Sequence, residues 1–436
     1  MAKNTVQGKA FLFLRDKSLF VVAFLISFLM VCALWSFIDP RSTFPKPHST
    51  ASDGGVTAAY GCATGFHGAN LSQDPPERTF YDDPSVSYSF GSLVRNWDKK
   101  RREWLKRHPF FATARDGLVV VTGSQPLPCK NPIGDHLLLR LFKNKVDYCR
   151  IHGYEIFYNN AFLHPKMVGV WAKLPPVRAA MVAHPEAEWI WWVDSDAVIT
   201  DMEFKLPMKK YESYNFIING WENMIYERKS RFAMNTGIFL IRNCQWSMDF
   251  MEAWMGPQTP NYEKWGQILT TAIKDKLYPV SDDQTAMVYL LMKERERWGD
   301  KVFLEHEYCI QGYWLHLVKT LDNITRNYIG LEKKVERLRR RHAEKVSESY
   351  GTVWEPYLEE AGYRKDAGKR PCITHFTGCQ QCSGEHNSMY EGDSCWKEME
   401  RALNFADNQV LRNYGFMHQD LLDSSPLSLV PFGFPA

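Results

Sequence analysis

The stretch WIWWVDSD, residues 189–196, decides the expected fold. Its first five residues form a continuous apolar run of strand length, which is typical of a strand with both faces buried. Asp194-Ser195-Asp196 follows directly, and the carboxyl ends of such strands are where α/β proteins bind ligands. Ordinary turn or helix-cap chemistry at Ser195 or Asp196 is the alternative interpretation, and the residues alone leave the two balanced.

Apolar segments of strand and helix length alternate on both sides of this run. We expect further strands over residues 118–122, 154–158, 216–219 and 237–241. We expect helices over residues 137–148, 177–183, 246–254, 283–295, 331–349 and 395–413. The alternation in the first half of the chain predicts an α/β fold in which helices cover a mostly parallel sheet.

The composition excludes several classes of protein. The 436 residues are 45% hydrophobic and 24% charged, and 53 basic and 50 acidic residues leave a net charge of +3. These values exclude a disordered chain, a collagen-like fibre and a protein with many membrane spans. The near balance of charge gives no indication of a nucleic-acid partner.

The N-terminal segment predicts the compartment. Residues 19–38, LFVVAFLISFLMVCALWSFI, carry no charge and are long enough to cross a hydrocarbon core of ~30 Å as a helix. The basic excess before them favours a cytosolic N-terminus. We therefore expect a cytosolic tail over 1–17, a transmembrane signal anchor over 18–38, a lumenal stem over 39–95 and a catalytic domain over 96–436. The alternative, a cleaved signal peptide, also enters the secretory pathway, although its apolar core is usually ~7–15 residues long.

Other features fit that compartment. Asn70 and Asn323 each begin a glycosylation triplet, Asn-Leu-Ser and Asn-Ile-Thr. Nine cysteines follow the apolar segment, and in an oxidising lumen several should pair, with at least one left over. For Cys379 and Cys382, which form a CxxC, we favour structural disulfides over half a zinc site because no second CxxC exists.

Two more motifs carry chemistry. Ser281-Asp282-Asp283-Gln284 precedes an apolar helical segment and would present acids to a sugar or an acceptor, although ordinary helix-start chemistry is the favoured interpretation of these residues alone. His375 stands beside a Gly turn in Thr374-His-Phe-Thr-Gly378-Cys, where a structural histidine is the usual outcome. As a third metal ligand beside two aspartates, it would suit Mn²⁺ better than Mg²⁺.

Several long motifs in the same order resemble plant glycosyltransferase family 34, which holds xyloglucan 6-xylosyltransferases and galactomannan 6-galactosyltransferases. The motifs are WWVDSDAVITDMEFKLP, RNCQWSMDF, SDDQTA, RRRHAEKVSE, THFTGC and MERALNFADNQVLRNYGF. The similarity extends from about Thr79 to the C-terminus. RLRRRHAEKVSE and the ending SPLSLVPFGFPA are similar to the galactomannan galactosyltransferase branch.

The resemblance implies a GT-A nucleotide-sugar-binding fold in a type II Golgi membrane protein. It implies a retaining, Mn²⁺-dependent enzyme that moves a sugar from a UDP-sugar, in α-1,6 linkage, onto a β-1,4-linked hemicellulose. Galactose from UDP-galactose onto a mannan backbone is the leading expectation, and xylose from UDP-xylose onto xyloglucan is the alternative. A catalytically weak partner subunit of a Golgi hemicellulose-synthesis complex is the alternative of a different class. Oligomers with itself or with other glycosyltransferases are left open.

The resemblance also assigns residues. Asp194 and Asp196 form the DxD motif, and these two with His375 are the implied Mn²⁺ ligands. The implied donor-binding residues are Gly123, Ser124, Lys173, Asp194, Ser195, Asp196 and Gly378, and the implied catalytic residues are Asp282, Asp283 and Gln284. Front-face attack and double displacement both stay open. The chain departs from the family's pattern at Asn219, Arg231, Gln311 and Gln381, and the first three put the sugar specificity in question.

Overall fold

The computed structural model describes residues 80–430 apart from 88, 110, 112–116, 168, 256–260, 277–278, 309, 340–343, 364–367 and 425–426. These residues belong to one compact unit, Asp74–Ala436. The expected tail, anchor and most of the stem, with Asn70, lie outside the described residues. Within the described part, no helix is long and apolar enough to cross a membrane.

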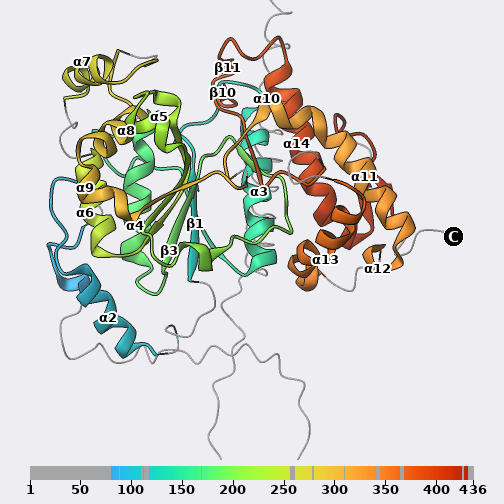
Figure 1. The fold of residues 1–436 in the computed structure, drawn as a ribbon, viewed down its shortest axis with the longest axis horizontal. Coiled ribbons are helices and arrows are strands. Elements are labelled where there is room, and N and C mark those ends of the chain that lie inside the picture. The colour runs from blue at the N-terminus through green and yellow to red at the C-terminus, as the bar shows by residue number, and fades with distance from the viewer. Residues whose placement is uncertain are drawn as a thin grey trace, which may run out of the picture. The chain divides into compact units, whose positions relative to one another are not determined.

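A six-stranded sheet forms the centre of the unit, in the order β2-β1-β3-β6-β5-β7 (Figure 1). The strands are β1 (Leu118–Gly123), β2 (Glu155–Asn159), β3 (Trp189–Val193), β5 (Phe216–Gly220), β6 (Met234–Arg242) and β7 (Val302–Glu305). β6 pairs antiparallel with β3 and β5, and the other pairings are parallel. The expected α/β fold with a mostly parallel sheet is confirmed, and all five expected strands belong to this sheet.

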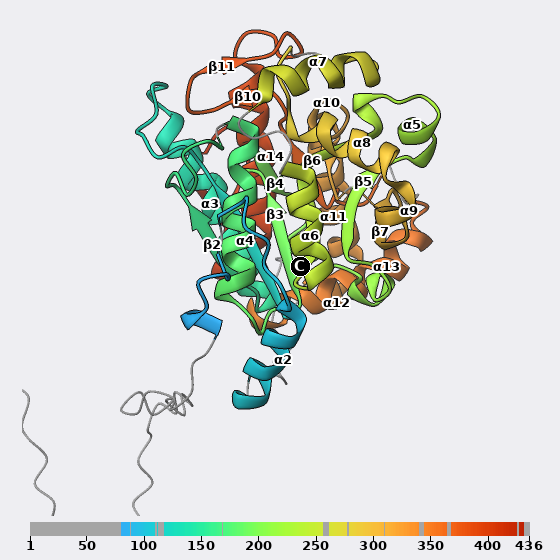
Figure 2. The ribbon, with the colours of Figure 1, turned by 90° about the vertical axis from the view of Figure 1, so that its left-hand side faces the viewer.

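Helices cover both faces of the sheet, as Figures 1 and 2 show. Helices α3 (Gly134–His152), α11 (Leu321–Lys334) and α14 (Ser394–Leu411) share one apolar cluster with Val120 and Trp191. Helices α4 (Leu174–Ala183), α6 (Gln245–Met255) and α8 (Asp283–Lys293) share the other with Val121 and Trp192. Successive residues of β1 and β3 therefore face opposite cores, which is why these two strands are almost entirely apolar.

A second, three-stranded sheet has the order β4-β9-β8. β4 (Ala197–Ile199) begins immediately after Asp196 and pairs antiparallel with β9 (Ile373–His375), with Ala197 opposite His375. β8 (Gly312–Tyr313) pairs parallel with β9 on its other side. This small sheet joins two segments that lie far apart in the sequence.

The expected helix over 331–349 is wrong. α11 ends at Lys334 because Val335 adopts an extended backbone, and the chain continues as α12 (Glu336–Arg339) and α13 (Ser347–Glu360). The buried side chains of α11 recur three or four residues apart from Leu321 onward, so its apolar stripe begins before the charged segment that suggested the helix. The remaining named elements are α2 (Trp97–Arg107), α5 (Glu222–Tyr226), α7 (Tyr262–Ala272), α9 (Arg295–Trp298), α10 (Trp314–Leu317), β10 (Cys379–Gln380), β11 (Glu385–His386), β12 (Phe416–His418) and β13 (Leu427–Leu429).

Candidate active site

A cavity of about 1640 Å³ opens where β3, β5 and β7 end and the opposed strand β6 begins. The ends of parallel strands are where an α/β sheet binds its ligand. Most of the residues expected to act on the donor line this one cavity: Lys173, Asp194, Asp196, Asp282, Asp283, Gln284, His375 and Gly378.

Asp194, Asp196 and His375 form a cluster at the carboxyl end of β3. His375 Nε2 lies 3.1 Å from Asp196 Oδ1 and 3.9 Å from Asp194 Oδ2. Each side chain offers one ligand atom, and the three atoms all lie within 4.8 Å of one another. Two carboxylates and an imidazole at this spacing fit a single divalent ion of the Mn²⁺ type.

Backbone pairing holds this cluster together. Asp194 N–H donates to Gly237 O at 2.9 Å, and Phe376 N–H donates to Asp196 O at 3.1 Å. Gly237 faces the cluster so closely that a Cβ there would lie 2.3 Å from His375 Cε1 and 2.7 Å from Asp194 Oδ2. Only glycine leaves room for both side chains at this position.

Lys173 supplies a buried positive charge beside the cluster. Its Nζ lies 2.9 Å from Asp283 Oδ2 and 3.4 Å from Asp194 Oδ1, and it donates to Thr236 O at 3.1 Å. Burial lowers the pKa of Lys173, but the two carboxylates outweigh burial and raise that pKa above its ordinary value. The ammonium group therefore stays charged at neutral pH.

The two aspartates at the start of α8 have different partners. The Asp282 carboxylate caps the helix, accepting from the Thr285 N–H at 2.9 Å and from Lys276 Nζ at 2.8 Å. The Asp283 carboxylate pairs with Lys173 and accepts from the Thr236 hydroxyl at 2.8 Å. The helix-start alternative thus describes Asp282, whereas Asp283 belongs to the buried charge network beside Asp194.

The chain matches the model of the galactosyl transferase GMA12/MNN10 family over residues 114–386, more than half its length. It is 54% identical over 441 aligned residues to galactomannan galactosyltransferase 1 of Cyamopsis tetragonoloba, covering 100% of both chains. The chain belongs to this family, glycosyltransferase family 34. It is a glycosyltransferase.

The chain is also similar to a second relative in sequence and to one solved structure. The glycosyltransferase is 45% identical to a probable xyloglucan 6-xylosyltransferase 1 of Oryza sativa subsp. indica, over 79% of this chain and 70% of the relative. The solved structure of a glycosyltransferase involved in the glycosylation of the major capsid of PBCV-1 matches with a TM-score of 0.32 and 13% identity, over 45% of this chain and 84% of that one. That score is too low to argue from.

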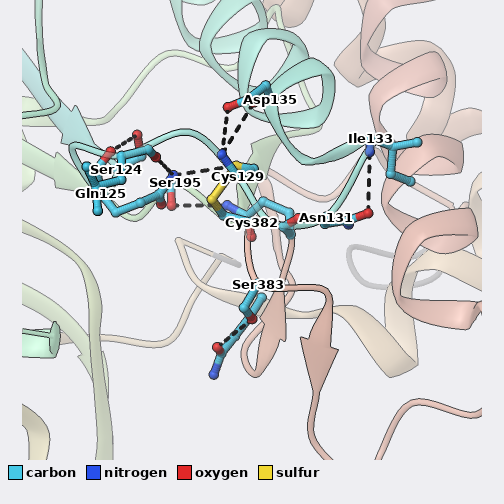
Figure 3. The surroundings of a disulfide bond; sticks show 12 residues. Ser124, Gln125, Cys129, Asn131, Ile133, Asp135, Ser195, Cys382 and Ser383 are labelled. Carbon is cyan, nitrogen blue, oxygen red and sulfur yellow. Dashed lines mark hydrogen bonds between the residues drawn. A yellow bond between two sulfur atoms is a disulfide. The ribbon is translucent and has the colours of Figure 1, made fainter.

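Three expected donor-binding residues of the glycosyltransferase do not line the cavity. Gly123 packs so closely on β2 that a Cβ would lie 2.2 Å from Asn159 O. The Ser124 hydroxyl accepts from Tyr158 Oη at 2.7 Å, and the Ser195 hydroxyl accepts from Gln381 Nε2 at 3.2 Å. Figure 3 shows Ser124 and Ser195 near a disulfide.

That disulfide joins Cys129 to Cys382, and a second joins Cys379 to Cys395. The expectation that the CxxC makes structural disulfides is confirmed, because each of its cysteines bonds to a distant partner. Asn131 Nδ2 also donates to Gln381 O at 2.9 Å, so the loop after β1 is fastened to the turn between β10 and β11 (Figure 3).

Sequence reasoning missed part of the cavity wall. Asn235, Thr236 and Gly237 line it at the start of β6, and Trp192 Nε1 donates to Asp194 Oδ1 at 2.6 Å. A polar Asn-Thr-Gly triplet opening an apolar strand was the available signal, analogous to the acids that follow β3. Trp192 gave no such signal, because it lies in a strand of apolar residues that all look like core residues.

The residues at the four positions that depart from the family pattern each make a hydrogen bond or a close polar contact. Gln311 Nε2 lies 3.2 Å from His375 Nδ1, and Asn219 Nδ2 donates to Glu305 O at 2.9 Å. Gln284 Nε2 donates to Arg231 O at 2.8 Å, and Gln381 reaches Ser195. Gln311 is thus the departure that touches the proposed metal cluster.

Proposed function

We propose that this glycosyltransferase moves galactose from UDP-galactose, in α-1,6 linkage and with retention of configuration, onto a β-1,4-linked mannan. Its full-length likeness to a galactomannan galactosyltransferase supports this choice of substrates. The observation that carries the chemistry is the Asp194–Asp196–His375 cluster beside a buried lysine. The strand order and the acids at the end of β3 support a GT-A type of fold.

Asp194, Asp196 and His375 would hold Mn²⁺, which when bound supplies positive charge to a departing diphosphate. Lys173 contributes a second, permanent charge at the same wall. Asp283, held by Lys173 and Thr236, would offer a negative oxygen to the positive charge that develops on the sugar. These fixed charges can stabilise either a front-face or a double-displacement route.

A second candidate is xylosyl transfer from UDP-xylose to a xyloglucan-type backbone, which the 45% identity to a probable xyloglucan 6-xylosyltransferase favours. The two donors differ by one CH₂OH group, which a pocket discriminates by only ~1–3 kcal/mol. The partner-subunit alternative is less supported, because the cluster and Lys173 are all in place.

The full-length chain should be incubated with Mn²⁺, UDP-galactose or UDP-xylose, and manno- or cello-oligosaccharides. We expect transfer of galactose to manno-oligosaccharides. Asp196→Asn should abolish both transfer and Mn²⁺ binding measured by electron paramagnetic resonance, whereas Asp393→Asn, at an exposed surface aspartate, should change neither. If the enzyme transferred only xylose, and only to cello-oligosaccharides, the second candidate function would replace the proposed one. If no donor and acceptor pair gave transfer, the partner-subunit alternative would be favoured.

We also propose that the protein is a single-pass type II protein of the Golgi membrane with residues 18–38 as its anchor. The uncharged run of residues 19–38 supports this proposal. Asn323 is exposed on the first turn of α11, where a glycan would meet no packed neighbour. Cell fractionation with protease protection tests the topology, and a lost mobility shift in Asn323→Gln tests the glycan.

A further inference from the structure

A second hollow of about 710 Å³ adjoins the transfer cavity. Trp221 and His306 line both hollows, so the two meet along these side chains. The second hollow is lined by residues of α5, α9 and β7. A small donor occupies one cavity, whereas an acceptor polymer needs a track that leaves it.

Trp221 is unusual among the tryptophans that the structure describes. It is 45% exposed and is the one described tryptophan in the exposed class, whereas nine others are buried. Phe232, 54% exposed, lines the same wall of the transfer cavity. Exposed aromatic rings beside a site offer flat apolar faces of the kind on which sugar rings stack.

The backbone holds these two aromatic residues at the cavity wall. Trp221 N–H donates to Ala233 O at 2.9 Å, and Gly220 pairs with Met234 where β5 meets β6. Gln284, next to Asp283, donates to the carbonyl oxygen of Arg231, the residue before Phe232. The aromatic wall is therefore fixed relative to Asp283, the acid proposed to act on the reacting sugar.

The second hollow has the chemistry of a neutral glycan site. Its polar lining includes Glu222, Asn223 and Asp300, and its basic residue Arg295 pairs with Glu222. The Arg295 guanidinium also lies 4.1 Å from the centre of the Tyr226 ring. Acids outnumber the single arginine in this lining, which disfavours a phosphate or another polyanion and suits a chain of hydroxyl groups.

We propose that the acceptor backbone runs from the transfer cavity across Trp221 and His306 into this second hollow, which binds sugars remote from the reaction. The proposal rests on the proposed function and specifies where a β-1,4-linked backbone lies. Sugars in the second hollow add binding energy only when the acceptor is long enough to reach it, so affinity should rise with acceptor length until the track is filled.

The test uses the full-length chain with Mn²⁺ and UDP-galactose on manno-oligosaccharides of increasing length. Trp221→Ala should raise KM for long acceptors about tenfold, the loss of one ring contact, and change KM for the shortest acceptor much less. Trp221→Phe, which keeps a ring, should restore most of the affinity. Asn223→Ala should raise KM for long acceptors only. Phe162→Ala removes an exposed ring outside both hollows and should leave KM unchanged for every acceptor.

Hydrolysis of UDP-galactose without acceptor reports on the donor site and should be equal in all these variants. If Trp221→Ala raised KM equally for short and long acceptors, or did not raise it at all, the proposed track would be overturned. If Asn223→Ala left KM for long acceptors unchanged, the second hollow would not be part of the track. If the wild-type chain transfers to no acceptor, the proposed function fails separately. Length-dependent binding of manno- or cello-oligosaccharides that Trp221→Ala abolishes would then still support the track, and no binding would overturn it.

Discussion

Gly237→Ala tests whether the tight packing behind the proposed metal cluster controls its geometry. The new Cβ would lie 2.3 Å from His375 Cε1, and carbon atoms in contact are normally about 3.5–4.0 Å apart. Either the imidazole or β6 must therefore move by about 1 Å. A displacement of that size in a reacting site costs about 100-fold in rate, and overpacking costs about 1–3 kcal/mol of stability.

We expect Gly237→Ala to fold, to lose Mn²⁺ affinity and to lose about 100-fold in kcat/KM. Mn²⁺ titration by electron paramagnetic resonance measures the first loss, and initial rates with UDP-galactose measure the second. Gly330→Ala is the matched control, because a Cβ on that α11 residue meets nothing within 4 Å and should stabilise the helix by about 1 kcal/mol. A Gly237→Ala enzyme with wild-type Mn²⁺ affinity and turnover would refute the packing constraint.

Three further predictions concern buried charges and a disulfide. Lys173→Met leaves Asp194 and Asp283 without their shared cation, so urea unfolding should show a loss of about 3–5 kcal/mol. Cys129→Ser opens the 253-residue link to Cys382 and should cost about 2–4 kcal/mol, a difference that a reductant should remove. Burial raises the pKa of Asp201 to about 6, so the folded state binds the proton more tightly and stability falls as pH rises through about 4 to 6. Asp201→Asn should abolish that fall and add on the order of 1–2 kcal/mol at pH 7, measured by thermal unfolding across pH.

β1, β3 and β5 of the main sheet were predictable because burial on both faces leaves them largely apolar. β3 matches its expected bounds, and the acids after it do reach the cavity. β7 was missed since its Val302–Glu305 segment is short and partly exposed, and resembles many loops in composition. The charged segment after Lys334 was mistaken for one helix because charge can mark an exposed helical face but cannot locate a break.

The assembly of the Asp194–Asp196–His375 cluster could not be derived from local sequence. Asp196 and His375 meet because β4 and β9, each only three residues long, pair antiparallel. Strands that short have no recognisable alternation, so His375 could be linked with the aspartates only as a candidate third metal ligand and through the resemblance to the family. The opposite holds for Gly123, Ser124 and Ser195. Their motifs suggested contact with the donor, but these residues do not line the cavity.

The two disulfides give the short β4–β9 pairing a support that its own hydrogen bonds cannot supply. Cys379 and Cys382 follow His375 within a few residues, and both are tied to other parts of the chain. A three-residue pairing has few hydrogen bonds and little apolar area, so its free energy of formation depends on how the neighbouring loops are restrained. The geometry of the cluster should therefore depend on the oxidised state of the chain: reduction would loosen the loop after His375 before it unfolded the large sheet. A chain of this sequence made in a reducing compartment should keep its α/β core and bind a divalent ion poorly.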